Sequence, residues 1–433
     1  MDRFEKAGYE IYVVGGAVRD VLTGKEVYDW DFTTNATPEQ ILKVFPEGFY
    51  DNQFGTVGLA HESSRVPYEI TTYRTESEYT DKRRPDKVEW GKNLEEDLAR
   101  RDFTMNALAI ASDLSIVDPW GGQEDLKKKI IRAVRDPHER FNEDALRMMR
   151  AIRLAAQLGF QIEEETLRAI KKHAQLVRHV AMERVKVELF KLLASKHPKH
   201  GIEQLHETGL MEYILPEFEE GYGSEQKSPG RHHIHDVATH QLLSLENCPS
   251  SDPLVRFATL IHDIGKPKTR KVTSDGIVTF YNHEVVGARM SKEIGARLRF
   301  SKKESSRLWI LVRWHQFTVD ERQTDSALRR FITRVGKENL QDMLDLRTGD
   351  RLGGGAAETS WRLEKFKKRL EEVQKQPFSV ADLKVNGKDV MEILKVKPGP
   401  EVGMTLKALF KEVEKDQTKN NRDYLLRRLK EVA

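Results

Sequence analysis

Short apolar segments with strand character recur through the first third of the chain. They are rich in β-branched and aromatic residues, a pattern that predicts strands, and they lie at residues 9–14, 30–34, 57–60 and 68–73. Thr37 and Pro38 predict a helix start, because threonine is a favourable N-cap and proline suits the first helical position. We therefore predict an α+β fold that begins with a small mixed sheet in residues 1–136.

Helical spacing replaces strand spacing after about residue 136. Residues 142–159 carry apolar side chains at helical intervals and end at Gly159, which is typical of a helix C-terminus. Turn-forming residues predict breaks at 221–230 and 353–355 and a hairpin turn at 274–276. The chain is thus predicted to have four parts: residues 1–136, a helical neck and body at 137–222, a histidine-rich helical domain at 223–355 and a helical tail at 356–433.

Composition narrows the class of protein. Charged residues make up 33% of the 433 positions, and the sequence has no run of about 18 apolar residues, so we expect no membrane span. Cys248 is the single cysteine, so no disulfide can form within the chain, which predicts a cytoplasmic location. The net charge of +3 is too small to indicate nucleic-acid binding by itself, so any basic surface has to be local.

A glycine pair follows the first predicted strand and opens a helix, in the run GGAVRD at residues 15–20. Gly15 and Gly16 would let backbone N–H groups approach a phosphate, and a helix N-terminus favours negative charge. Arg19 adds a guanidinium that can bind phosphate through two hydrogen bonds. Because such turns are common, this run indicates a nucleotide site only together with other residues.

Asp29 and Asp31 form a pair of carboxylates on either side of Trp30, at the start of the second predicted strand. Residues i and i+2 of a strand point to the same face, where two carboxylates repel each other unless a cation binds. Two Mg²⁺ ions about 4 Å apart can use such a pair to activate an attacking hydroxyl and stabilise a leaving pyrophosphate. Glu69, on the fourth predicted strand, is a candidate third carboxylate. The alternative is that these residues are solvated strand positions.

Polar residues that suit a nucleotide follow in two clusters. The first has side chains that commonly contact phosphates and ribose, namely Arg101, Asp102 and Asn106. The second recurs at intervals of three and predicts a slanted ridge on a helix, made of Asp144, Arg147, Arg150 and Arg153. A carboxylate and a guanidinium can together select cytosine and adenine by hydrogen bonds, without a nucleic-acid template. The alternative is an ordinary ion-paired helix surface.

Histidines and aspartates form a second constellation. The adjacent pair His262-Asp263 offers an imidazole and a carboxylate that suit one divalent metal. The full set of candidate ligands is His240, His262, Asp263 and Asp350, with His283 and His315 for a second metal or a substrate phosphate. Lys266 could also bind phosphate. The alternatives to the first and last ligands are His235 and Asp345.

The ordered motifs GGAVRD, DWDFTT, RRDFTMNA and EDALRMMRAIR resemble class II tRNA nucleotidyltransferases and bacterial poly(A) polymerases, within the polymerase-β-like superfamily. They cover about residues 10–195. The resemblance implies a nucleotidyltransferase palm at 1–136, RNA-binding parts at 137–222 and 356–433, and addition of C, C and A to tRNA from CTP and ATP. An A-adding enzyme and a poly(A) polymerase are the alternatives within the family.

The resemblance also assigns roles to residues. Gly16, Arg19 and Arg101 would contact the nucleotide, Asp102 the ribose, and Asp29 and Asp31 would bind Mg²⁺. Asp144 and Arg147 would contact the base edge, whereas Arg150 and Arg153 would hold phosphates. Residues 183–188 resemble a motif that braces the nucleotide-binding helix. Residues 74–88 resemble the loop of enzymes that add the terminal A, which argues against an enzyme that adds only CC.

The histidine constellation resembles the HD phosphohydrolase superfamily over about residues 230–350. The resemblance implies a phosphomonoesterase or phosphodiesterase with Mg²⁺ or a divalent transition metal, consistent with trimming or repair of RNA ends. For the whole chain, the alternative is an HD phosphohydrolase whose N-terminal half only binds RNA. The carboxylate pair Asp29 and Asp31 argues against it, since a binding module has no need of paired metal ligands.

Overall fold

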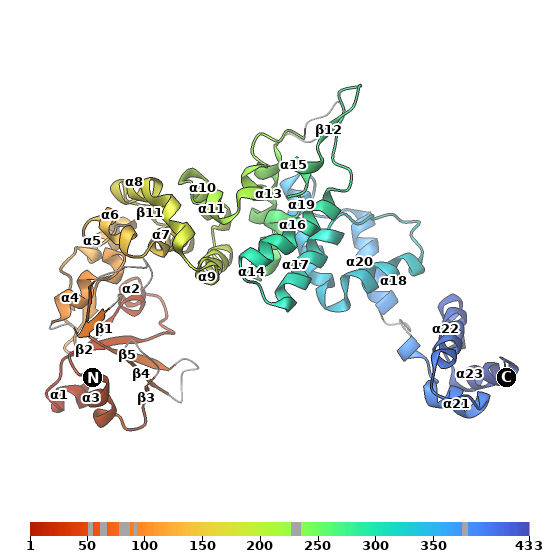
Figure 1. The fold of residues 1–433 in the computed structure, drawn as a ribbon, viewed down its shortest axis with the longest axis horizontal. Coiled ribbons are helices and arrows are strands. Elements are labelled where there is room, and N and C mark those ends of the chain that lie inside the picture. Colours follow the sequence, from red (N-terminus) through yellow and green to blue (C-terminus); the bar gives the residue numbers. More distant parts are fainter. Residues whose placement is uncertain are drawn as a thin grey trace.

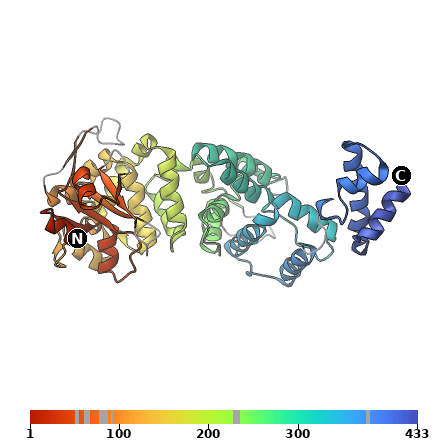
Figure 2. The same ribbon diagram turned by 90° about the horizontal axis from the view of Figure 1, so that it is seen from below.

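The structure is a computed structural model that describes residues 1–50, 55–60, 67–77, 87–90, 93–226, 235–374 and 380–432. The molecule is elongated, with the N-terminus in the head at one end and the C-terminus in the tail at the other (Figures 1 and 2). In Figure 1 the head and the tail both lie below the helical middle, so that the chain forms an arch. Within the described ranges, no helix combines the length and the apolar character needed to cross a bilayer.

The head is built on a mixed sheet whose described strands have the order β3-β4-β5-β2-β1-β8-β9. Strands β2 and β5 are parallel, and the other neighbours are antiparallel. The strands are β1 (Ile11–Val14), β2 (Asp31–Thr34), β3 (Phe49–Tyr50), β4 (Thr56–Leu59), β5 (Tyr68–Thr72), β8 (Ala109–Ile110) and β9 (Ile116–Val117). The predicted α+β fold is confirmed, and the four predicted strands correspond to β1, β2, β4 and β5.

The helices of the head flank this sheet (Figure 1): α1 (Asp2–Lys6), α2 (Gly16–Leu22), α3 (Pro38–Val44), α4 (Leu94–Ala99) and α5 (Gly122–Lys128). Helix α3 starts where the sequence predicts, because the Thr37 hydroxyl accepts from the Gln40 backbone N–H while the Gln40 side chain accepts from the Thr37 N–H at 2.8 Å. The ends of segment 74–88 pair as antiparallel β6 (Arg74–Ser77) and β7 (Lys87–Trp90). Its middle, residues 78–86, lies outside the described residues.

The neck and body are helical: α6 (Pro137–Glu143), α7 (Leu146–Leu158), α8 (Glu164–His173), α9 (Met182–Leu193), α10 (Pro198–Glu207), α11 (Met211–Ile214) and α12 (Pro216–Glu219). The end of α7 at Gly159, with φ +70°, is as predicted. A short parallel pair, β10 (Ile130–Ile131) and β11 (Gln161–Ile162), links the end of the head to the end of α7.

One prediction about α7 was wrong. Residues 142–159 do not form one helix, because Asp144 is extended at φ −137° and ψ 102° and separates α6 from α7. Its carboxylate accepts from the Leu146 backbone N–H at 3.0 Å, and a short acidic side chain that bonds to the backbone in this way competes with helix formation. Asp144 therefore precedes α7, and only Arg147, Arg150 and Arg153 of the predicted ridge lie on it.

The next part packs α13 (Val237–Glu246), α14 (Pro253–Ile261), α15 (Lys266–Thr269), α16 (His283–Arg297), α17 (Lys302–Trp314), α18 (Asp325–Val335), α19 (Leu340–Gly353) and α20 (Trp361–Gln374). The predicted hairpin is present as β12 (Lys271–Val272) and β13 (Val278–Thr279), with Gly276 at φ +77° in its turn. Part of the predicted break at 221–230 lies outside the described residues, and α19 ends at the predicted break at 353.

The tail consists of α21 (Gly387–Leu394), α22 (Pro400–Lys415) and α23 (Arg422–Val432). It has its own core, formed by Leu383, Val385, Val390, Leu409, Val413, Leu425 and Leu429. A much larger core runs without interruption from Val13 in the head to Val373 in α20. The predicted boundaries between the four parts stay predictions.

Candidate functional site

All of the predicted nucleotide-binding residues line one cavity of about 430 Å³ between the head and α7. The predicted residues in its wall are Gly15, Gly16, Arg19, Asp31, Arg101, Asp102, Asn106, Asp144, Arg147, Arg150 and Arg153. They come from the β1–α2 turn, the start of β2, the segment after α4, and α7 with the residue before it. Five arginines face three aspartates in this set, a balance that suits an anionic ligand with several phosphates.

The turn between β1 and α2 is shaped by Gly15. This residue has φ +72°, and a Cβ atom there would lie 3.0 Å from Arg101 Nη1 and 3.5 Å from Asp31 Oδ2. Glycine is therefore needed both for the backbone conformation and for the space between a cation and a carboxylate. The start of α2 therefore lies in the cavity wall.

Three carboxylates gather at the edge of the cavity. Asp31 is the first residue of β2, and the parallel register places Glu69 of β5 beside it. Asp29 lies two residues before β2 and not on the strand as predicted, because the strand begins only at Asp31. Burial and the charge of Asp29 raise the pKa of Asp31 to about 6, with Glu69 adding to the rise and Arg101 opposing it. This all-oxygen donor set fits a hard divalent cation, which would relieve the repulsion.

A chain of polar side chains crosses the floor of the cavity. Arg19 Nη1 donates to Asn106 Oδ1 at 2.9 Å, and Asn106 Nδ2 donates to Asp102 Oδ1 at 3.1 Å. Arg150 Nη2 lies 2.8 Å from the other oxygen of Asp102. Burial alone would raise the pKa of Asp102, but Arg150 and the bond from Asn106 hold it below its ordinary value. These side chains are therefore already oriented before a nucleotide binds.

The residues predicted to contact the base are also held in place. Asp144 Oδ2 accepts from Arg184 Nη2 of α9 at 2.8 Å. Arg147 Nη1 donates to Glu143 Oε2 at 2.7 Å, and its Nη2 donates to the Arg100 carbonyl at 3.0 Å. The buried guanidinium of Arg147 thus has a fixed direction.

Helix α9 braces α7 at a second point, since Arg153 Nε lies 2.6 Å from Glu188 Oε2. The contacts of Arg184 and Glu188 agree with the bracing role implied for residues 183–188. Both residues lie on the face of α9 that packs against α7.

Sequence reasoning missed several residues of the cavity wall, among them Arg100, Leu154, Gln157 and Leu158. Gln157 lies one helical turn after Arg153 and accepts from its Nη1 at 2.7 Å, so the helical period could have identified it. Asp97 was also missed. It is fully buried and ion-pairs with both Arg100 and Arg101, although in the acidic run EED it looks like a surface residue.

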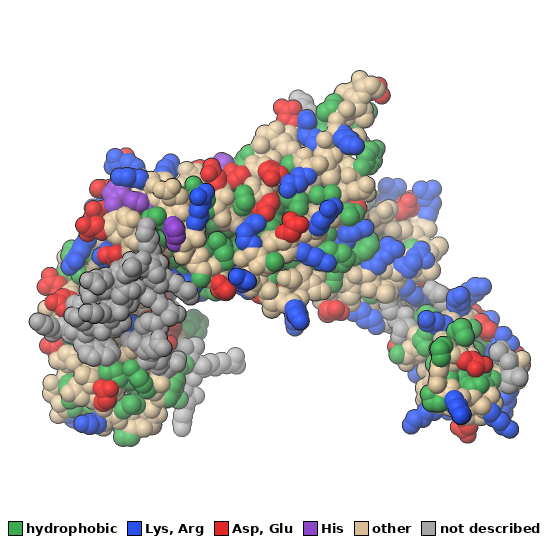
Figure 3. Space-filling view, in the orientation of Figure 1, with side chains coloured by type: hydrophobic (Ala, Val, Ile, Leu, Met, Phe, Trp, Pro, Cys, Tyr) green, Lys and Arg blue, Asp and Glu red, His purple; other side chains and the backbone are tan. Residues whose placement is uncertain are grey.

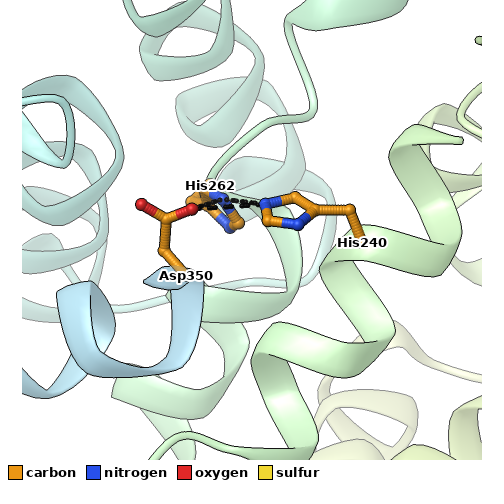
Figure 4. Close-up of side chains that lie close together, drawn as sticks. All are labelled: His240, His262 and Asp350. Carbon is orange, nitrogen blue, oxygen red and sulfur yellow. Dashed lines mark hydrogen bonds and ion pairs between the residues drawn. The ribbon is translucent and has the colours of Figure 1, made fainter. Parts of the chain in front are cut away.

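The histidines and aspartates of the second constellation meet between α13, α14, α16, α17 and α19. They form two groups whose ligand atoms lie within 4.8 Å of one another: His240, His262 and Asp350, and Asp263, His283 and His315. Figure 4 shows the first group, with the imidazoles of His240 and His262 turned toward the Asp350 carboxylate. His240 Nε2 lies 3.3 Å from Asp350 Oδ1.

Asp263 lies between the two groups. Its Oδ2 is 3.3 Å from His262 Nε2, whereas its Oδ1 is 3.2 Å from His283 Nε2. One carboxylate thus faces both groups, as a ligand shared between two metal ions would. The structure adds Asp263 to the pair His283 and His315, which the sequence alone left without a carboxylate.

The imidazoles are oriented for metal binding by the backbone. The Nδ1 atoms of His262, His283 and His315 lie 2.7, 2.9 and 2.7 Å from the carbonyls of Thr259, Phe280 and Val312. Each ring can donate to its carbonyl and present a bare Nε2 to the centre. The mixed nitrogen and oxygen donors fit a divalent metal such as Mn²⁺, Fe²⁺ or Ni²⁺.

Without a metal ion, cationic side chains balance the two carboxylates of this centre, since Lys266 pairs with Asp263 and Arg347 Nη1 lies 3.1 Å from Asp350 Oδ2. Burial lowers the pKa of His262, but Asp263 and Asp350 outweigh it and raise that pKa to about 10. Lys266 Nζ lies 2.5 Å from Asp263 Oδ2, where it partly neutralises this carboxylate. Lys266 is therefore at the centre and within reach of a phosphate bound there.

The two alternative ligands lie elsewhere. His235 lines a separate cavity with His206 and Tyr222, and Asp345 accepts from Gln341 at 2.7 Å. Of each pair of candidates, the structure brings His240 and Asp350 to the centre.

Profiles of known families match successive parts of the chain. Residues 11–132 match the poly A polymerase head domain, and residues 159–221 match an RNA- and SrmB-binding site of polymerase A. Residues 232–344 match the HD domain, and residues 296–429 match tRNA nucleotidyltransferase domain 2.

Curated relatives and a solved structure extend the comparison. The chain is 35% identical over 441 residues to a CCA-adding enzyme of Ligilactobacillus salivarius, covering 100% of this chain and 95% of that protein. It is 50% identical over 219 residues to a CCA-adding enzyme of Levilactobacillus brevis, which covers only 50% of this chain and 54% of that protein. The Bacillus stearothermophilus CCA-adding enzyme in complex with CTP matches with a TM-score of 0.72 and 29% identity, covering 99% of this chain and 95% of that chain.

Proposed function

Because the chain belongs to the family of CCA-adding enzymes, we propose that the cavity between the head and α7 is where it carries out its reaction. The protein is a tRNA nucleotidyltransferase that adds C, C and A to the 3′ end of tRNA from CTP and ATP. The observation that carries the assignment of the site is the meeting of Asp31 and Glu69 in register on β2 and β5, at the edge of an arginine-lined cavity.

The carboxylates would hold the metal ions of the reaction. Asp29 and Asp31 would bind Mg²⁺, with Glu69 as the third carboxylate. When bound, the ions supply a lowered pKa for the attacking 3′-hydroxyl and charge neutralisation for the leaving pyrophosphate. The 3′-hydroxyl oxygen then forms a bond to the α-phosphorus while the bond from that phosphorus to pyrophosphate breaks.

The arginines would orient the triphosphate for this attack. Arg19 and Arg101 lie on the side of the β1–α2 turn and would bind the phosphates, with the Gly15–Gly16 turn leaving room for them. Asp102 lies deeper in the cavity, where it is positioned to accept from a ribose hydroxyl. Arg150 and Arg153 would add phosphate contacts along α7.

Asp144 and Arg147 would select the base without a template. Cytosine and adenine both present an exocyclic amino group, which can donate to a carboxylate, next to a ring nitrogen, which can accept from a guanidinium. Uracil and guanine present a carbonyl at the corresponding edge. Its partially negative oxygen would face the Asp144 carboxylate, and the two acceptors would repel each other. Protein side chains held by Arg184 and Glu143 thus take the place of a complementary base.

The test of this function is incorporation on three tRNA transcripts, which lack the CCA end, end in its first C or end in CC. Each is given CTP, ATP or both, with Mg²⁺. We expect each transcript to be completed to CCA and then left unextended, and Asp29→Ala with Asp31→Ala to abolish addition while tRNA binding remains. Addition of A alone to the CC-ended transcript would indicate an A-adding enzyme, and long A tails would indicate a poly(A) polymerase.

We further propose that the second constellation is a phosphohydrolase centre with two metal ions. The observation that favours it is Asp263, whose two oxygens face the two separate groups of ligands. His240, His262 and Asp350 would hold one ion, and His283 and His315 the other. Lys266 would bind a phosphate oxygen of the substrate, which is consistent with a role in trimming or repairing RNA ends.

Metal content and hydrolysis test this centre separately. In a background of Asp29→Ala with Asp31→Ala, which removes the metal ligands of the head, we expect the protein purified with Mn²⁺ or Ni²⁺ to hold two ions per chain by elemental analysis. Adding His283→Ala should leave one ion. We also expect phosphate esters of p-nitrophenol to be cleaved. Asp29→Ala with Asp31→Ala is the matched control, because it should lose nucleotide addition and keep this hydrolysis. A single bound ion in this background would contradict the shared role of Asp263.

A further inference from the structure

A hollow of about 470 Å³ lies between α16 and α17 and is distinct from both centres. Its walls include the lysines Lys292 and Lys302, the aromatic residues Phe300 and Trp309, and the hydroxyls of Ser305 and Ser306. In Figure 3 basic and apolar side chains are interspersed with some acidic ones over α16 and α17. Neither the nucleotidyl transfer proposed for the cavity nor the hydrolysis proposed for the histidine–aspartate centre involves this hollow.

The residues of the hollow belong to one face of α17. Lys302, Ser306, Trp309 and Arg313 recur at positions i, i+4, i+7 and i+11, which share one side of an α-helix. From the neighbouring α16, Lys292 Nζ lies 5.1 Å from the centroid of the Trp309 ring. The hollow thus combines an aromatic plane with cations on two adjacent helices.

Two carboxylates near this face are engaged by other cations. Glu304 accepts from Lys186 at 2.9 Å, and Glu284 Oε1 lies 3.6 Å from Arg313 Nη1. Lys292 and Lys302 are both exposed and leave the lining with a positive charge. Ammonium groups suit phosphates, and an indole ring suits stacking on a base or contact with a ribose.

Helix α9 connects this hollow to the nucleotide cavity. Phe300 packs against Phe190 of α9 with ring centroids 5.4 Å apart, and Lys186 of α9 binds Glu304 at the start of α17. On the same helix, Arg184 contacts Asp144 in the cavity wall. Arg184 and Phe190 are separated by about 9 Å along the axis at a rise of 1.5 Å per residue. The helical arm of a tRNA is much longer than this separation along α9, so one tRNA can contact both ends of the helix.

We propose that the α16–α17 hollow is a docking surface for the tRNA whose 3′ end occupies the cavity, with Lys292 and Lys302 on the phosphate backbone and Trp309 against an exposed ribose or base. The inference rests on the proposed nucleotidyl transfer and adds to it a contact outside the reaction centre. The contact is electrostatic and selects no sequence, as an enzyme that acts on every tRNA requires.

The test is steady-state CTP incorporation on full-length tRNA by the full chain carrying Lys292→Glu and Lys302→Glu. We expect KM for tRNA to rise about tenfold, KM for CTP to stay unchanged, and the dependence of tRNA affinity on salt to weaken by about one to two phosphate contacts. Trp309→Ala is expected to raise KM for tRNA with the salt dependence intact, because it removes a contact that involves no charge.

The matched control reverses the same number of charges in the head, away from the cavity lining, at the exposed Lys6 of α1 and Lys43 of α3. This variant should leave KM for tRNA within about twofold, and equal thermal stability of all variants would exclude misfolding as the cause. An unchanged KM for tRNA and an unchanged salt dependence in the Lys292 and Lys302 variant would overturn the proposal that the hollow binds tRNA. If the wild-type protein added no nucleotide to tRNA, the proposed function itself would fail first.

Discussion

At the scale of single residues, the ionised carboxylate of Asp31 destabilises the folded protein more than an ordinary surface carboxylate does. Its pKa is raised to about 6, so the folded protein binds a proton there more tightly than the unfolded chain does. Stability is therefore lost as pH rises from about 4 through about 6, and the loss persists at higher pH. The residue remains charged at neutral pH only at the expense of folding free energy.

We predict that Asp31→Asn stabilises the metal-free protein at pH 8 by about 1–3 kcal/mol, since about two pKa units correspond to that range after partial screening. The same change should abolish nucleotide addition. Thermal unfolding in EDTA at pH 8 and at pH 4 measures the effect, and the difference between variant and wild type should nearly vanish at pH 4. A variant less stable than the wild type at pH 8 would contradict this account.

Asp144 is expected to set which nucleotides are accepted. Asp144→Ala removes the acceptor for the exocyclic amino group and leaves Arg184 without its partner, so the ratio of kcat/KM for CTP to that for UTP should fall by about tenfold or more. Single-nucleotide incorporation with the four nucleoside triphosphates measures it. Arg168→Ala, at an exposed position of α8, is the control that should keep the ratio, and an unchanged ratio in Asp144→Ala would remove this residue from base selection.

At the scale of elements, the β1–α2 turn joins the two halves of the cavity. Gly15 is held at φ +72° with Arg101 and Asp31 on either side of the space where a Cβ would lie. The strand and the helix are ordinary, but a Cβ at their junction would be in tight contact with Arg101 Nη1 and in van der Waals contact with Asp31. Replacement here would shift the Arg101 guanidinium or the turn itself.

We predict that Gly15→Ala lowers kcat/KM for CTP by at least about tenfold, because the displaced Arg101 contributes to phosphate binding. Gly24→Ala is a matched control, since Gly24 has a similar φ of +66° but nothing within 4 Å of the place that a Cβ atom would take. Both variants should lose about 1–3 kcal/mol of stability from the positive φ, with the larger loss at Gly15, whose ψ is −136°, and only Gly15→Ala should lose activity. Equal activities would show that the close approach to Arg101 is unimportant.

Elements with a strong local pattern could be predicted from the sequence, and those made by distant contacts could not. The capping residues of α3 and the glycine that ends α7 act within one turn, so their signals are visible in the sequence. Strands β8 and β9 have two residues each and depend on distant pairing, since β8 pairs with β1 and β9 with β8. The break before α7 was missed although its cause is local, namely the bond from the Leu146 backbone N–H to the Asp144 carboxylate.

The candidate sites show the same division. Ligand types and their order along the chain identified nearly all of the residues that the structure brings together. The sharing of Asp263 between two groups could not be predicted, because it depends on how α14, α16 and α17 converge. Asp97 was missed for the same reason, since its burial is invisible in the run EED.

At the scale of the whole molecule, the arch places head and tail on the same side of the helical middle (Figure 1). The nucleotide cavity, helix α9 and the hollow at α17 are joined by direct contacts, whereas the tail has a core of its own. A central part with one continuous core and an end with a core of its own is the arrangement expected of an enzyme that holds a long substrate at points far from its reaction centre.

The uninterrupted core from Val13 to Val373 has a consequence for how the protein melts. The neck and the metal-binding helices share this core with the head, and strand β1 joins it to the two smaller cores of the head. These parts should therefore lose structure as one cooperative unit, while the tail, with its separate core of seven residues, should melt on its own. Scanning calorimetry should therefore resolve a small endotherm, absent after truncation at residue 374, beside a large one. Divalent metal should move only the large endotherm to higher temperature, and a tail that melts together with the rest would show that the two cores are energetically joined.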